Sequence, residues 1–108
     1  MMKLKLGILD QSPISMGSNA TAALHNSINL AVFAEEAGFN SLMYSEHHGV
    51  EAYGSSSPEL LAAIILSKTQ RIKVGTGGIM MRNYSAYKIA EWTKLLGSLY
   101  PERFILGL

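Results

Sequence analysis

The sequence contains no cysteine, so disulfide bonds and thiolate metal sites are excluded. It has no excess of one charge, because 9 basic and 8 acidic residues leave a net charge of +1. That balance lacks the electrostatic footprint of a protein that binds nucleic acid or an anionic membrane. No apolar run approaches the length of a membrane span, and the first residues lack the apolar core of a signal peptide. We therefore expect a cytoplasmic protein that binds neither nucleic acid nor membrane.

The sequence does contain enough apolar material for the core of one domain, since nearly half of its 108 residues are hydrophobic. Apolar runs that predict strands alternate with segments of three- and four-residue spacing that predict helices. The expected strands are 3–10, 41–45, 71–76 and 104–108, and the expected helices are 20–37, 58–69 and 85–99. This β-α-β-α-β-α-β order predicts an α/β fold of parallel strands joined by right-handed crossovers.

The expected helices carry end signals. Gly38 is expected to end the first helix, and Ser57 to cap the second with Pro58 in its first turn. Ser85 is expected to cap the third helix, and Pro101 to end it. The residues expected on the core faces of the second and third helices are Leu60, Leu61, Ile64, Ile65, Ile89, Trp92, Leu96 and Leu99.

Chemically active residues follow three of the expected strands. Asp10-Gln11, Glu46-His47-His48 and Thr76-Gly77-Gly78 each stand at a carboxyl end. In parallel α/β folds these ends share one rim, and working residues gather there. Histidine changes charge near neutral pH and is therefore a candidate general acid or base. The two glycines let a flat ligand approach the main chain closely.

The same residues are also compatible with simpler roles. Glu46-His47-His48 lacks a second ligand pair, so a metal site is not expected, and a solvated loop is the plainer alternative. Gly75-Thr76-Gly77-Gly78 lacks the third glycine of a dinucleotide loop, and alone it is typical of a tight strand exit. Asp10 and Gln11 either bind ligand or cap the loop before Pro13.

Several motifs, in order along essentially the whole chain, resemble the N-terminal part of the bacterial luciferase-like flavin-dependent monooxygenases. The pair of histidines after the glutamate, followed at this distance by the glycine-rich strand, is the strongest part of the match. The segments that carry the resemblance are Leu9-Asp10-Gln11-Ser12-Pro13, Ser45-Glu46-His47-His48, Ser56-Ser57-Pro58-Glu59, Arg71-Ile72-Lys73-Val74-Gly75-Thr76-Gly77-Gly78 and Tyr100-Pro101-Glu102-Arg103-Phe104.

The resemblance implies a fold, an activity and a cofactor. The fold would be the N-terminal half of a TIM (β/α)8 barrel, with residues 1–108 as one domain. The activity would be that of a monooxygenase in which reduced FMN and O2 oxidise a small organic substrate such as an aldehyde. Some relatives use a deazaflavin instead. A flavin reductase would supply the reduced cofactor.

The resemblance also implies roles for single residues. His47 matches the catalytic histidine beside the flavin, and Glu46 and His48 match its neighbours on the cofactor side. Thr76, Gly77 and Gly78 match the strand exit that carries the flavin ring, where the Gly77-Gly78 peptide is expected to be cis. Asp10 and Gln11 would lie at the substrate side of the rim. His48 is also open to a simpler role, a hydrogen bond within its own loop.

A TIM barrel has eight strands and needs roughly 200–250 residues or more. This sequence of 108 residues has only four expected strands. The family's flavin-phosphate arginine would follow beyond Leu108. We therefore expect a piece of a longer protein or a half-barrel completed by association. Helices 58–69 and 85–99 match those of the family's dimer interface, so a homo-oligomer is expected. The alternative function is a non-catalytic flavin-binding or dimerising half-barrel module.

Overall fold

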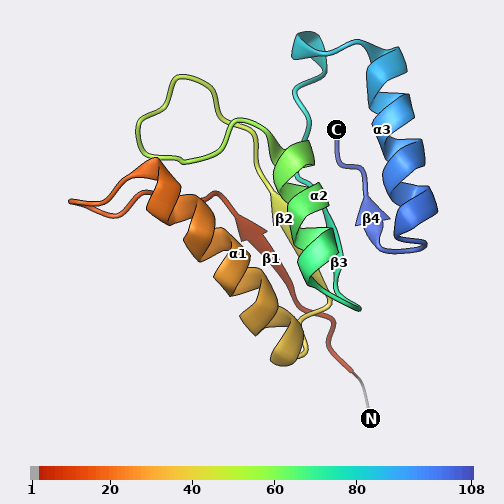
Figure 1. Cartoon of the computed structure of the whole chain (residues 1–108), viewed down its shortest axis with the longest axis horizontal. Helices are drawn as coiled ribbons and strands as arrows, with labels where there is room; N and C mark the ends of the chain where they lie inside the picture. Colours follow the sequence, from red (N-terminus) through yellow and green to blue (C-terminus); the bar gives the residue numbers. More distant parts are fainter. Residues whose placement is uncertain (1–2) are drawn as a thin grey trace.

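The computed structural model describes residues 3–108 as a sheet with helices packed along it (Figure 1). A short 3-10 turn, η1, precedes the last helix. The elements in chain order are β1 (Gly7–Asp10), α1 (Ala20–Glu36), β2 (Ser41–Tyr44), α2 (Pro58–Lys68), β3 (Lys73–Thr76), η1 (Met81–Asn83), α3 (Ala86–Leu99) and β4 (Phe104–Ile105).

The sheet has four parallel strands in the order β1-β2-β3-β4. The predicted α/β fold and its parallel sheet are therefore confirmed. The strands are shorter than expected, because β1 begins at Gly7 rather than Lys3 and β4 ends at Ile105. The register aligns two rows of side chains across the sheet. One row is Ile8, Leu42, Val74 and Phe104, and the other is Leu9, Met43, Gly75 and Ile105.

The first row faces the helices and forms the core. Leu42 and Val74 are completely buried, and Ile8 and Phe104 pack against the same cluster. Apolar residues of the helices complete this core, chiefly Ala31, Ala34, Leu61, Ala62, Ile65, Leu66 and Leu96. Because successive residues of a strand point to opposite faces, the second row lies on the other side of the sheet, where Leu9 is 58% exposed.

The helix ends confirm some of the sequence signals and correct one. Asn19 caps α1 by accepting from the Ala22 N–H, and Ser85 caps α3 by accepting from the Lys88 N–H. Gly38 follows α1 with a φ of +89°, in the left-handed region that favours glycine. Ser57 occupies the N-cap position of α2, but its side chain makes no capping bond within residues 3–108.

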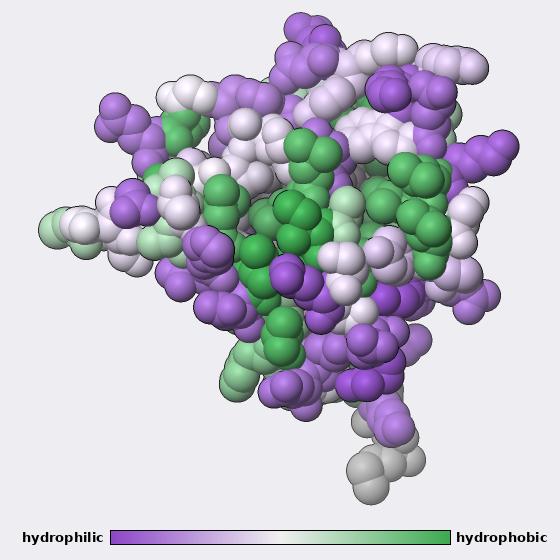
Figure 2. Space-filling view, viewed as in Figure 1, coloured by the Kyte–Doolittle hydropathy of each residue, from purple (hydrophilic) through white to green (hydrophobic). Residues whose placement is uncertain are grey.

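The outer faces of α2 and α3 carry apolar side chains that were expected in the core. Leu60, Ile64 and Leu99 are exposed, and so is Leu95 of α3. Figure 2 shows apolar surface gathered over the helices on this side of the molecule. Three- and four-residue spacing fixes which residues share a helix face, but a helix apolar on two sides leaves open which side meets the sheet.

Arg103 ties the end of α2 to the start of β4. Its Nη2 donates to Thr69 Oγ1 at 2.6 Å, its Nη1 to the Thr69 carbonyl at 3.2 Å, and its Nε to the Ile72 carbonyl at 3.1 Å. The guanidinium also lies 5.7 Å from the centre of the Tyr100 ring. This contact set explains in structural terms why an arginine stands just before β4.

Glu35 holds the turn between α2 and β3. Its carboxylate accepts from the N–H groups of Gln70, Arg71 and Ile72, with the shortest bond 2.6 Å. Burial alone would raise the pKa of Glu35, but these backbone bonds outweigh it and hold the pKa below its ordinary value. The carboxylate therefore stabilises the fold when it is charged.

We expect Glu35→Gln to destabilise the chain by about 1–2 kcal/mol at neutral pH, because charge-assisted bonds become neutral ones. A lowered folded pKa means that the stabilisation is complete above the ordinary glutamate pKa of about 4.3 and is lost as pH falls through the folded value. Urea unfolding across this range measures the difference between variant and wild type. Glu36→Gln, on an exposed neighbour, is the control. A pH-independent difference would contradict this role.

Candidate functional site

The carboxyl ends of β1, β2 and β3 meet at one edge of the sheet, as the parallel order requires. Hydrogen bonds continue the pairing past the strands. The Ser45 N–H donates to the Asp10 carbonyl at 3.4 Å, and the Gly77 N–H donates to the Tyr44 carbonyl at 2.8 Å. The structure thus brings the three predicted segments to a common rim.

A segment of bare backbone lies at this rim. The peptide bond between Gly77 and Gly78 is cis, as the resemblance implied. A Cβ on Gly77 would lie 3.1 Å from Met43 Cβ and 3.4 Å from Leu9 Cδ1, both on the face of the sheet away from the helices. A Cβ on Gly78 would lie 2.9 Å from the carbonyl carbon of Leu108. The two glycines are half-buried, and the absence of a side chain lets this segment pack closely on its apolar neighbours and on the backbone at Leu108.

His47 lies half-buried in the loop that follows β2. Its ring stacks on Tyr53, with 4.3 Å between ring centres and 25° between planes. Its Nε2 atom is buried and has no hydrogen-bond partner within residues 3–108. A buried ring nitrogen without a partner is costly unless a ligand or an ordered water meets it. Within residues 3–108, this atom is one of four buried and unpaired polar atoms at the ends of β1 and β2, together with Asp10 Oδ2, Tyr44 Oη and Ser45 Oγ.

The side chain of Glu46 is completely buried and is the centre of a hydrogen-bond network. Its Oε1 accepts from the Met80 N–H at 3.2 Å and from Tyr84 Oη at 2.9 Å. Its Oε2 lies 2.6 Å from His48 Nε2 and accepts from Asn83 Nδ2 at 3.4 Å. Burial alone would raise the pKa of Glu46, but these four hydrogen bonds outweigh it and lower the pKa.

The network extends from Tyr84 towards α2. Burial and the hydrogen bond to Glu46 raise the pKa of Tyr84, so its phenol stays protonated and donates at neutral pH. Burial chiefly, and then the negative charge of Glu46, raise the pKa of Glu59. The ring of Tyr84 also packs against Trp92 of α3, with 5.5 Å between centres. The loops after β2 and β3 are therefore locked together and onto the helices.

Comparison with known proteins decides the family. The family model for luciferase-like monooxygenases matches residues 2–108. The chain belongs to the luciferase-like monooxygenase family. An uncharacterized protein of Bacillus subtilis (strain 168) is 50% identical over 105 residues, which are 97% of this chain and 32% of that protein. The N-acetyl-S-alkylcysteine monooxygenase of the same strain is 39% identical over 105 residues, 97% of this chain and 31% of that enzyme.

A solved structure extends the comparison to a flavin complex. The oxygenating constituent of 3,6-diketocamphane monooxygenase from Pseudomonas putida, in complex with FMN, superposes with a TM-score of 0.89 at 26% identity. The match covers 97% of this chain and 29% of that one. This luciferase-like chain corresponds to the N-terminal part of the family's TIM barrel, and it spans about a third of the length of the curated relatives it matches.

The remaining predicted site residues of this luciferase-like chain have mostly local partners. Asp10 is buried, and its Oδ1 accepts from the Ser12 N–H at 2.8 Å. This is the bond expected if Asp10 caps the loop before Pro13. Gln11 is exposed beside it. Thr76 is buried, and its Oγ1 donates to the Gly107 carbonyl and accepts from the Gly107 N–H. His48 is half-exposed and bonds to Glu46 and Asn83 within the network.

Sequence reasoning missed the residues that bind Glu46 from the loop after β3. Met80, Asn83 and Tyr84 are not among the site residues that the sequence predicts. One signal was available, since a loop that leaves the carboxyl end of β3 must pass the same rim as Glu46. Tyr53 was also missed, because nothing in the spacing places it against His47.

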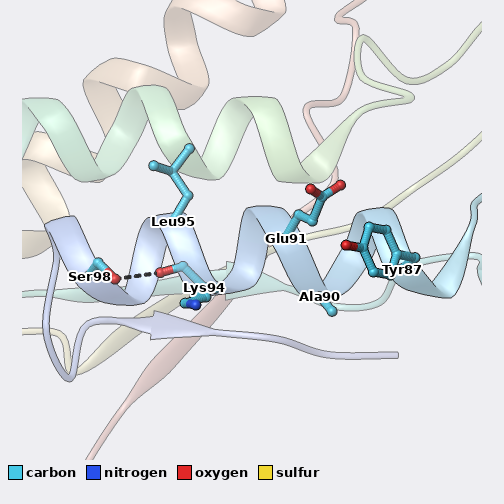
Figure 3. Close-up of a pocket in the computed structure, with 6 residues that line it drawn as sticks. All are labelled: Tyr87, Ala90, Glu91, Lys94, Leu95 and Ser98. Atoms are coloured by element: carbon cyan, nitrogen blue, oxygen red, sulfur yellow. Dashed lines mark hydrogen bonds between the residues drawn. The ribbon is translucent and has the colours of Figure 1, made fainter.

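An open pocket on α3 is lined by Tyr87, Ala90, Glu91, Lys94, Leu95 and Ser98, and Figure 3 shows Leu95 and Glu91 projecting from the same side of that helix. Residues 3–108 include no group of three His, Asp or Glu side chains placed to hold a metal ion. In the same range, no helix combines the length and apolar character needed to cross a membrane.

Proposed function

We propose that this chain forms the flavin-ring site of a flavin-dependent monooxygenase that oxidises a small organic substrate, such as an aldehyde, with O2. In this proposal, residues 1–108 act as one partial-barrel domain. The observation that carries it is the side-chain-free Gly77-Gly78 segment at the rim, beside apolar Leu9 and Met43. Membership of the monooxygenase family and the FMN complex of a structural relative support the choice of FMN.

The residues at the rim fit a flavin on two counts. A flat, largely apolar ring needs close approach to the main chain, and Gly77 and Gly78 allow it because they carry no side chain. A flavin also carries ring nitrogens and carbonyl oxygens, and the unsatisfied Nε2 of His47 offers a partner for one of them or for the substrate. Reduced FMN, when bound, supplies the electrons that activate O2.

His47 would serve as the acid or base of the reaction. Histidine is the most frequent general acid or base in enzymes, and the Nε2 atom of His47 is shielded from water. The shielding strengthens any hydrogen bond that Nε2 makes to a bound group, because fewer water molecules compete for it. The Tyr53 stack and the neighbouring Glu46 network hold this part of the loop in place.

Glu46, His48 and Thr76 would act on cofactor binding indirectly, because they hold the backbone segments that lie at the flavin site. Glu46 and His48 join the loop after β2 to the loop after β3, which begins with Gly77-Gly78. Thr76 joins the end of β3 to the backbone of Gly107, which follows β4. Asp10 and Gln11 would border the substrate, with two groups available for hydrogen bonds: the exposed amide of Gln11, and Asp10 Oδ2, which has no partner within residues 3–108.

The proposal includes partners of the complete protein. A flavin reductase would supply reduced FMN, and a deazaflavin is the alternative cofactor. The exposed apolar residues of α2 and α3, Leu60, Ile64, Leu95 and Leu99, support a homo-oligomer that uses helices 58–69 and 85–99. Burying such side chains is the usual driving force of homodimer association.

Titration of FMN into the chain tests the ring site. We expect saturable quenching of flavin fluorescence with a dissociation constant below about 1 mM, equivalent to about −4 kcal/mol. His47→Ala should weaken binding by up to about tenfold, because one hydrogen-bond partner is lost. His25→Ala, on the exposed face of α1, is the matched histidine control and should bind as the wild type does.

Oxygen uptake separates the two functional alternatives. A monooxygenase should consume O2 in the presence of reduced FMN faster when an aldehyde is added, and His47→Ala should abolish the increase. A non-catalytic flavin-binding module would retain FMN and show no dependence on the aldehyde. Absence of saturable FMN binding up to millimolar concentration would contradict both and leave the dimerising module.

A further inference from the structure

Tyr53 is held on His47 by the pairing of two loops that are distant in sequence. Pro13 and Tyr53 form an antiparallel bridge between the loop after β1 and the loop after β2. The Ile14 N–H donates to the Ala52 carbonyl at 2.8 Å, and the Gly54 N–H donates to the Ser12 carbonyl at 2.8 Å. The main chain on both sides of Tyr53 is therefore fixed by hydrogen bonds.

The close fit around Gly54 fixes this segment further. A Cβ on Gly54 would lie 3.2 Å from Ala23 Cβ and 3.3 Å from the carbonyl oxygens of Ala20 and Ser12. The residue after Tyr53 is thus seated against the first turn of α1, where a larger side chain would need its neighbours to shift. As a result, the backbone that carries the Tyr53 ring is held in place on both sides.

The Tyr53 ring restricts the imidazole of His47. The two rings lie 4.3 Å apart and nearly parallel, so Tyr53 covers one face of the imidazole. Rotation of the histidine side chain would break this stack. The Nε2 atom is buried and has no hydrogen-bond partner within residues 3–108.

We propose that Tyr53 is a positioning residue, which sets the plane of the His47 imidazole and so directs Nε2 at the bound flavin or substrate. This inference rests on the proposed function for the choice of ligand, while the orientation of His47 is independent of it. The stack requires an aromatic ring and does not require the phenol hydroxyl, for which no hydrogen bond within residues 3–108 is found.

Two substitutions separate the ring from the hydroxyl. Tyr53→Phe keeps an aromatic ring, and Tyr53→Leu keeps only apolar volume. In the wild type and in Tyr53→Phe, the ring protons of His47 should be shifted upfield in the NMR spectrum by the stacked ring. In Tyr53→Leu this shift should be lost, and FMN affinity should fall by up to about tenfold, as expected for loss of one aromatic contact and its orientation of the histidine.

Phe33→Leu is the matched control, because Phe33 is 64% exposed on α1 and should change neither readout. Two results would overturn the proposal: an unshifted His47 ring in the wild-type chain, or a Tyr53→Leu variant with wild-type His47 resonances and FMN affinity. Loss of FMN affinity in Tyr53→Phe would also overturn it, since the hydroxyl would then be the active group. If the wild type retains the His47 shift but binds no FMN, the proposed function fails while the orientation of His47 by Tyr53 stands.

Discussion

Gly75→Ala should largely unfold this chain. A Cβ at position 75 would collide with the carbonyl oxygen of Ile105 and would lie 2.8 Å from Ile105 Cβ. The collision is with backbone of the paired strand, so a side-chain rotation cannot relieve it. Because Gly75 pairs directly with Ile105, β4 would have to separate from β3. We expect a loss of about 3 kcal/mol or more in the free energy of unfolding.

Urea unfolding followed by circular dichroism measures this loss, and Gly97→Ala provides the control. Gly97 lies inside α3, and a Cβ there would meet no atom of residues 3–108 within 4 Å apart from its own neighbours in the helix. Alanine there should stabilise the chain by about 0.5–1 kcal/mol, since glycine is unfavourable in a helix interior. A Gly75→Ala variant with the wild-type unfolding midpoint would show that β4 does not pair with β3 as described.

Replacing Glu46 should break the connection between the loops after β2 and β3. Glu46→Leu would leave two part-buried donors, the N–H of Met80 and the hydroxyl of Tyr84, without an acceptor. We expect a loss of about 2–3 kcal/mol, because an unsatisfied donor costs about 1–3 kcal/mol when it is fully buried and less when water can reach it. FMN affinity should fall with it, since Gly77-Gly78 begins the loop that Glu46 holds.

Glu46→Gln gives a graded comparison and a pH signature. The amide oxygen can still accept from Met80 and Tyr84, so we expect a loss of only about 1 kcal/mol at neutral pH. The pKa of Glu46 is lowered in the folded chain, so the carboxylate's advantage over the amide should be complete above about pH 4.3 and vanish as pH falls through the folded value. Unfolding measurements across this range, with Glu36→Gln as control, test it. Equal effects of Leu and Gln would contradict the network.

The sequence was sufficient to predict the order of elements and the rim. Alternation of strand and helix patterns predicted the parallel sheet, and that order alone placed Asp10, His47 and Gly77 at one edge. The resemblance to the luciferase-like family added the cis peptide at Gly77-Gly78, which no local pattern indicates. Periodicity also separated helix from strand, since these periods differ strongly.

Other features depend on contacts that spacing does not encode. Glu46 stands next to two histidines in the sequence, but two of its donors come from residues more than thirty positions later, Met80 and Tyr84. Tyr53 meets His47 only because the loops after β1 and β2 pair. Leu60 and Leu99 fit a core-facing pattern, and their exposure follows from how α2 and α3 rotate on the sheet.

NMR spectra of the isotope-labelled chain, recorded during addition of oxidised and then reduced FMN, test the central claim most directly. The claim is that the flavin ring lies against Gly77-Gly78 with His47 beside it. It predicts saturable shifts centred on the amides of Gly77 and Gly78 and on the His47 ring, with smaller changes at Leu9 and Met43 and none on the exposed face of α1. Shifts centred elsewhere, or no saturable shift up to about 1 mM FMN, would contradict it.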